Sequence, residues 1–127
     1  MFQQIYLLLR KMVFSCWWRA SEKEMRRIAN YYGYQVKVRT FSVFERHPIL
    51  RGIRLIGECR YREELLLVSS QETRVFWHEL GHAASPLWCR YLFGKKIADW
   101  VISEISATVL GYYLNTKWWI KKKEGWL

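Results

Sequence analysis

The sequence has few of the residues that build disulfide frameworks or interdomain linkers. Its three cysteines, Cys16, Cys59 and Cys89, are odd in number, far apart and never spaced as CxxC. This pattern argues against a disulfide framework or a cysteine zinc knuckle, and it fits a reducing, cytoplasmic compartment. Only two prolines and no glycine- or serine-rich stretch interrupt the chain. We therefore expect a single domain that spans residues 1–127.

Long apolar runs are also missing, although the N-terminal stretch MFQQIYLLLRKMVFSCWWR is strongly hydrophobic. Arg10 and Lys11 interrupt it, and neither side reaches the roughly 18 apolar residues of a membrane span. No transmembrane segment is expected. Residues 2–18 are instead expected to form an apolar helix or extended segment that packs on the core or faces a partner. Attachment to a membrane surface is a second interpretation.

Acidic residues are scarce. The chain has 11 aspartates and glutamates against 21 lysines and arginines, which gives a net charge of +10. Such a surplus favours an anionic partner, which can be nucleic acid, a lipid surface or an acidic protein. The C-terminal stretch NTKWWIKKKEGWL adds tryptophans that can stack on bases. A simply solvated basic surface, with a few tryptophans docked on the core, explains the same composition.

Alternation of apolar and polar residues predicts three strands, over residues 36–40, 53–61 and 65–68. The short polar turn at 62–64 indicates that the last two strands form an antiparallel hairpin. Helices are predicted before and after these strands. The fold class is therefore α+β, with a small three-stranded, mostly antiparallel sheet.

Three helices are expected besides the N-terminal segment. Each of the first two begins with a capping box, in which a serine precedes a glutamate by three residues. The first box is Ser21/Glu24, and its helix is expected to end near Gly33. The second box is Ser69/Glu72, and its helix is expected to end near Ser85. A last helix is expected over about residues 97–114.

The motif HELGH occupies residues 78–82, inside the second of these helices. Residues four apart share a helix face, so His78 and His82 can direct two imidazole nitrogens at one zinc ion. Glu79 lies one step round the helix and can take a proton from a zinc-bound water without ligating the metal. The alternative, ordinary surface or core histidines, is weakened by the apolar flanks, since buried polar groups need partners.

Gly81 adds a further indication, because glycine in a helix interior costs about 1 kcal/mol. Close approach of another backbone would justify that cost. A catalytic zinc site also needs a third protein ligand and one open position. The candidates for that ligand are His47, Cys89, Asp99 and Glu104.

Glu104 is the strongest of these candidates. The small residues Ala107, Thr108 and Gly111 share its side of the last predicted helix, together with Trp100, and they allow close approach to the motif helix. A carboxylate on such a face is buried and must be paired or bound to a metal. The alternative is a glutamate exposed at the helix edge. Asp99 suits a capping role and His47 a turn before Pro48.

HELGH followed by E-x-x-A at Glu104–Ala107 resembles the small gluzincin (HExxH) metallopeptidases of the ImmA/IrrE or ArdC-like zincin type, over about residues 21–114. The resemblance implies a zincin-like minidomain, in which the sheet packs on the active-site helix and on a following glutamate-bearing helix. It also implies that His78, His82 and Glu104 bind Zn²⁺ and that Glu79 is the catalytic base.

These observations predict a zinc metallopeptidase that hydrolyses peptide bonds of a protein substrate, with an exposed strand edge as one place for the substrate. Two histidines and a carboxylate also suit other divalent ions. Tyr112 and Tyr113 are candidate oxyanion donors, although we favour a core role for both. The alternatives are a nucleic-acid-associated, antirestriction-like zincin-fold protein, and a non-catalytic, zinc-stabilised interaction module.

Overall fold

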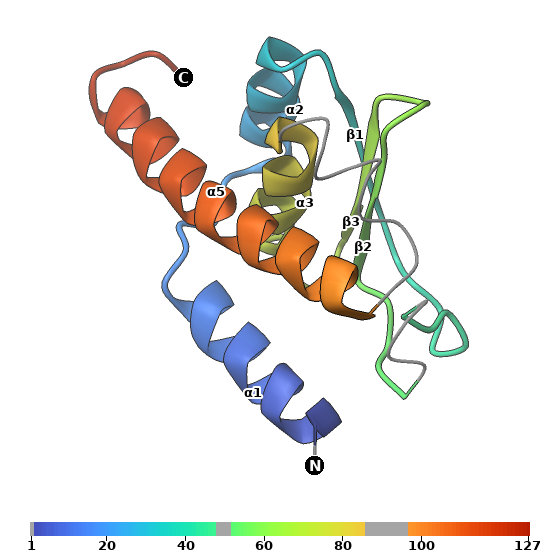
Figure 1. Cartoon of the computed structure of the whole chain (residues 1–127). Coiled ribbons are helices and arrows are strands. Elements are labelled where there is room, and N and C mark those ends of the chain that lie inside the picture. Colours follow the sequence, from blue (N-terminus) through green and yellow to red (C-terminus); the bar gives the residue numbers. More distant parts are fainter. Residues whose placement is uncertain (1, 48–51, 86–96) are drawn as a thin grey trace.

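The computed structural model describes residues 2–47, 52–85 and 97–127. These residues form an α+β fold with four helices and one three-stranded sheet (Figure 1). In chain order the elements are α1 (Phe2–Ser15), α2 (Glu22–Tyr31), β1 (Gln35–Arg39), β2 (Gly57–Arg60), β3 (Leu65–Ser69), α3 (Val75–Ala84) and α5 (Ile97–Lys123). Helix α3 lies between the sheet and α5, which places the HELGH motif at the centre of the molecule.

The sheet is mixed and has the strand order β1-β3-β2. The predicted hairpin is confirmed, since β2 pairs with β3 in antiparallel fashion, although β2 begins only at Gly57. Strand β1 pairs with β3 in parallel, with Val36 opposite Leu66. The sheet is mixed, rather than mostly antiparallel as expected, because β3 returns from the hairpin into the space between β2 and β1.

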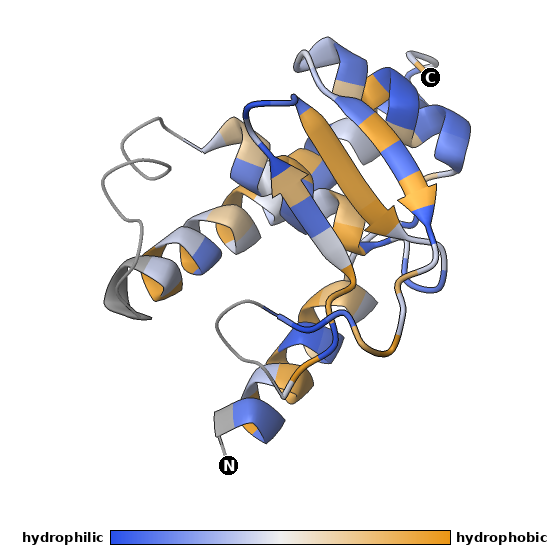
Figure 2. Ribbon diagram, turned by 90° about the vertical axis from the view of Figure 1, so that its right-hand side faces the viewer, coloured by the Kyte–Doolittle hydropathy of each residue, from blue (hydrophilic) through white to orange (hydrophobic). Residues whose placement is uncertain are grey.

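The central position of β3 explains its composition. A strand covered on both faces is apolar along its whole length, and Leu66, Leu67 and Val68 are all buried. Figure 2 shows β3 as the hydrophobic centre of the sheet. Leu66 and Val68 belong to the main core, together with Phe76 and Leu80 of α3. The sheet therefore anchors the motif helix through its apolar side, which leaves the polar motif residues on another side.

Helix α2 begins with the predicted capping box. The Ser21 hydroxyl accepts from the Glu24 backbone N–H at 3.2 Å, and the Glu24 carboxylate accepts from the Ser21 N–H at 2.9 Å. Replacing Ser21 by alanine is expected to lower the free energy of unfolding by about 1 kcal/mol, because one helix donor loses its acceptor. Denaturant titration of the variant would show this loss, whereas an unchanged midpoint would mean that the box contributes nothing.

The second predicted capping box is wrong. Ser69 is the last residue of β3, and α3 begins at Val75 with Arg74 as its N-cap and no side-chain cap. The Ser69 hydroxyl instead accepts from the Gln71 N–H at 3.2 Å, and the Glu72 carboxylate accepts from Arg74 Nε at 2.9 Å. The same residue types that cap helices also close turns, and here they connect the strand to the helix.

Helix α5 is longer than expected, since it continues past Leu114 to Lys123. Trp118 explains the extension, because it is buried and its indole N–H donates to the Tyr32 hydroxyl at 3.0 Å. This contact fixes the C-terminal half of α5 beside the end of α2. Among the described residues, no helix is both long and apolar enough to cross a membrane.

Candidate metal centre

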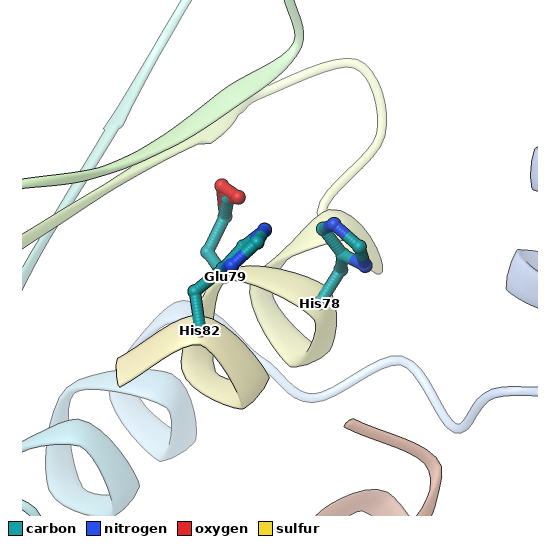
Figure 3. A group of neighbouring side chains, drawn as sticks. All are labelled: His78, Glu79 and His82. Carbon is teal, nitrogen blue, oxygen red and sulfur yellow. The ribbon is translucent and has the colours of Figure 1, made fainter. Parts of the chain in front are cut away.

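Helix α3 brings His78, Glu79 and His82 together. One potential ligand atom of each residue lies within 4.8 Å of the others, and the imidazole centroids are 4.7 Å apart. Figure 3 shows the three side chains rising from the same side of the helix. Glu79 is buried and the two histidines are partly buried. The helical spacing of HELGH thus produces a compact group of two imidazoles and one carboxylate, which is a donor set that can hold a metal ion.

Glu104 enters this group from α5. Its Oε2 lies 2.7 Å from His78 Nε2, and its Oε1 lies 3.1 Å from His82 Nε2. The carboxylate therefore faces both imidazoles, and it is only 19% exposed. The contact depends on the close packing of α5 against α3, because the two residues come from different helices. Two nitrogens and one carboxylate converge at this point.

Burial and charge act in opposite directions on the two glutamates. Burial raises the pKa of Glu79 to about 8, and the charge of Glu104 adds to this effect while that of His82 opposes it. Burial would also raise the pKa of Glu104, but the charge of His78 and the hydrogen bonds from both histidines outweigh it. They lower the pKa of Glu104 below its usual range. The pKa values of the two carboxyl groups are thus shifted in opposite directions.

Glu79 Oε2 is buried and has no hydrogen-bond partner among the described protein groups. A buried carboxyl oxygen without a partner is costly, so this oxygen calls for a partner beyond the described protein groups. A metal ion and its water would provide one. This unpartnered oxygen, together with the donor set of two imidazoles and a carboxylate, fits a divalent metal ion.

The Thr108 hydroxyl contacts both His78 and the backbone of Glu104. The hydroxyl donates to the Glu104 carbonyl at 2.8 Å, which leaves the oxygen free to accept from His78 Nδ1, 3.4 Å away. This contact orients the ring so that Nε2 points at Glu104. Partners of this kind fix the tautomer of metal-binding histidines. Sequence reasoning gave Thr108 only the role of a small packing residue, although its position one helical turn after Glu104 was the available signal.

Strand β2 lies against the same group. A Cβ added to Gly57 would lie 2.9 Å from a Val75 methyl group and 3.2 Å from Cγ of Glu79, so a larger residue here would have to displace these side chains. Because β2 stands at the edge of the sheet, an edge strand runs directly beside Glu79. The sequence did not reveal which strand forms the edge.

An aromatic group from distant parts of the chain borders the centre. The Tyr6 ring of α1 lies 6.1 Å from the ring of His47 and 5.9 Å from that of Trp100. Burial raises the pKa of Tyr6 to about 12, and the negative charge of Glu104 adds to the effect. Burial also lowers the pKa of His47. No pattern in the sequence pointed to Tyr6.

The other predicted candidates have different outcomes. His47 belongs to the aromatic group, and its ring packs on Trp100 with centroids 5.2 Å apart. Tyr112 and Tyr113 are each 59% exposed, so the core role favoured for them is wrong. Cys89 lies outside the described residues, and Asp99 is described only by its backbone within α5.

Comparisons with models of known protein families, with curated proteins and with solved structures gave no match. The firm result is therefore a His78–Glu79–His82 group on α3 that can hold a metal ion, with Glu104 hydrogen-bonded to both histidines.

Proposed function

We propose that the protein is a zinc-dependent metallopeptidase that hydrolyses peptide bonds of a protein substrate. The observation that carries the proposal is the Glu104 carboxylate, whose two oxygens face the Nε2 atoms of both motif histidines. His78, His82 and Glu104 would hold the metal, which is the ligand set of the gluzincin type that HELGH resembles. Three protein ligands leave a position open for chemistry, as catalytic zinc sites require.

Glu79 would act as the general base. When bound, zinc lowers the pKa of a water molecule and polarises the scissile carbonyl. Glu79 would take the proton of that water and deliver it to the leaving amine. Burial that raises its pKa to about 8 favours both steps, because a base with a pKa near neutrality can accept a proton and release it again.

Strand β2 offers a place for the substrate. It is an edge strand, and its first residue, Gly57, lies against Glu79. An extended peptide that pairs with this edge would gain main-chain hydrogen bonds and would bring one of its carbonyl groups beside Glu79. Placement by backbone pairing suits a peptidase, because it positions a peptide bond independently of its side chains.

Two other functions remain distinct proposals. A non-catalytic, zinc-stabilised module would keep the ligands and lack hydrolysis. A nucleic-acid-associated protein would use the basic, aromatic end of α5, where Lys123 lies 3.6 Å from the centre of the Trp119 ring. That contact occupies a tryptophan face that stacking on a base would need. The metal group argues against a purely nucleic-acid-binding role, and the buried Glu79 carboxyl, which a structural site would not need as a fourth group, favours hydrolysis over the module.

Zinc binding tests the proposal directly. Titration calorimetry on the purified chain should show one zinc per molecule, and saturation should raise the melting temperature, since a hundredfold excess over Kd adds about 2.7 kcal/mol of stability. Glu104→Ala should weaken zinc binding by at least a hundredfold, because it removes one of three ligands. Glu63→Ala, an exposed substitution in the turn after β2, provides the matched control and should bind zinc normally.

Cleavage tests the catalytic part. A mixed peptide library, read by mass spectrometry, should be cut by the zinc-loaded chain, and a chelator should stop cleavage until zinc is restored. Zinc bound without any cleavage would favour the module. Failure to bind zinc or any other divalent ion would overturn the whole proposal.

A further inference from the structure

Helix α5 carries an exposed apolar stripe on the side opposite its buried one. The members between residues 102 and 113 recur at spacings of three and four residues, and Trp119 and Ile120 follow about two turns later on the same side of the helix. Each is at least 41% exposed, and they are Ile102, Ile105, Val109, Tyr112, Tyr113, Trp119 and Ile120. A surface helix normally turns polar residues outward, so an apolar stripe along several turns calls for a partner.

Helix α1 carries a second stripe of the same kind. Tyr6 and Phe14 face the rest of the protein, whereas four residues at spacings of three and four point away from it. These four are exposed by 48%, 59%, 55% and 57%, and they are Ile5, Leu8, Leu9 and Met12. The exposed Cys16 continues this stripe after the helix ends.

The two stripes adjoin. A cavity of about 460 Å³ lies between the end of α1 and the middle of α5, and its lining includes Cys16 on one side and Tyr112 and Trp119 on the other. Figure 1 shows α1 and α5 together on the side of the molecule away from the sheet. The exposed residues of both helices, with Cys16, are called the α1/α5 surface below.

Cations predominate in the two segments that carry this surface. Residues 2–20 contain three cations and no acid, and residues 105–123 contain four cations and no acid. The cations are Arg10, Lys11, Arg19, Lys117, Lys121, Lys122 and Lys123. Lys122 is paired with Glu24 at 3.0 Å, while Lys11 and Lys123 are exposed. The partner that covers the surface should therefore combine an apolar interior with an anionic border.

We propose that the α1/α5 surface docks on an anionic lipid bilayer, with α1 and α5 lying along the interface. Exposed leucine, isoleucine and valine would enter the acyl boundary. Tyrosine, tryptophan and lysine would lie at headgroup depth, where aromatic rings and long basic side chains are enriched. A second copy of the chain suits the surface less well, because pairing would bring seven cations of one copy against those of the other. The proposal does not depend on the metal centre or on hydrolysis.

Sedimentation with lipid vesicles tests it. The full chain should bind phosphatidylcholine vesicles that contain phosphatidylglycerol, and pure phosphatidylcholine vesicles at least tenfold more weakly. Added salt should weaken the binding, because it screens the lysines from the headgroups. Leu8→Ser with Met12→Ser on α1, and separately Val109→Ser with Ile120→Ser on α5, should each reduce binding at least tenfold. All four side chains are exposed, so folding should persist, as circular dichroism would verify.

Matched controls lie elsewhere on the molecule. Val43→Ser with Phe44→Ser removes two apolar side chains that are 55% and 87% exposed, outside the α1/α5 surface, and should leave binding unchanged. Lys11→Gln with Lys123→Gln should weaken binding more than Lys37→Gln with Arg62→Gln, which changes the net charge equally on the sheet side. Absence of binding to anionic vesicles, equal loss in the Val43/Phe44 control, or dimerisation without lipid binding would each overturn the proposal.

Discussion

Replacing Glu79 by glutamine should lower the rate of peptide hydrolysis by about 10²- to 10⁴-fold, which is the usual contribution of a general base. Glutamine has nearly the same size and shape, so it preserves the packing against Gly57, but it cannot accept a proton from water. Zinc affinity should change by no more than a few fold, because Glu104 rather than Glu79 faces the Nε2 atoms of both histidines.

The measurement has two parts, namely steady-state cleavage of a peptide found with the library and zinc titration of the same preparation. Glu63→Gln makes the same chemical change at an exposed position in the β2–β3 turn and should retain full activity. Hydrolysis at the normal rate in Glu79→Gln would refute the role of base. Loss of zinc from this variant would show that Glu79 is itself a ligand.

The motif group was predictable because it is local. A spacing of four residues on a helix fixes the positions of His78 and His82 irrespective of the rest of the fold, and the structure brings the two rings together. The two strands around the 62–64 turn were predictable for the same reason. Each of these predictions needed only residues that are close in sequence.

Features that depend on distant contacts were harder to predict. The insertion of β3 between β1 and β2 requires β1 to pair with a strand far along the chain, with Gln35 opposite Leu65, and no local pattern specifies this pairing. Tyr6 reaches the vicinity of Glu104 only because α1 packs near the N-terminal part of α5. The prediction of which side of α5 is buried beyond Gly111 was also wrong. Tyr112 and Tyr113 are exposed, whereas Leu114 and Trp118 are buried.

One distant contact could be predicted, and it is the one on which the metal centre depends. Gly81 indicated that a second backbone comes close, and the structure confirms it, since a Cβ at Gly81 would lie 2.9 Å from the carbonyl carbon of Ala107 and 3.0 Å from the nitrogen of Gly111. Gly111 shows the reciprocal contact, because its added Cβ would lie 2.7 Å from the Trp77 oxygen. The two glycines let α3 and α5 pack backbone to backbone.

Gly81→Val should therefore destabilise the protein by about 3 kcal/mol or more, at the upper end of overpacking effects. Alanine or valine in place of glycine would ordinarily favour a helix, but backbone atoms of α5 cannot move aside as a side chain can. The melting temperature should fall by about 10 °C or more. Ala84→Val adds two carbons to an exposed position on the same helix and should change the melting temperature far less.

The milder variant Gly81→Ala separates packing from metal binding. Where it remains folded, α5 must shift away from α3, and the carboxylate of Glu104 must then move away from His78 and His82. Zinc affinity should fall in this variant although every ligand is present, and Ala84→Val should keep normal affinity. A folded Gly81→Ala protein with unchanged stability and unchanged zinc binding would contradict the close packing of the two helices. That packing sets how closely Glu104, which we propose as the third ligand, approaches His78 and His82.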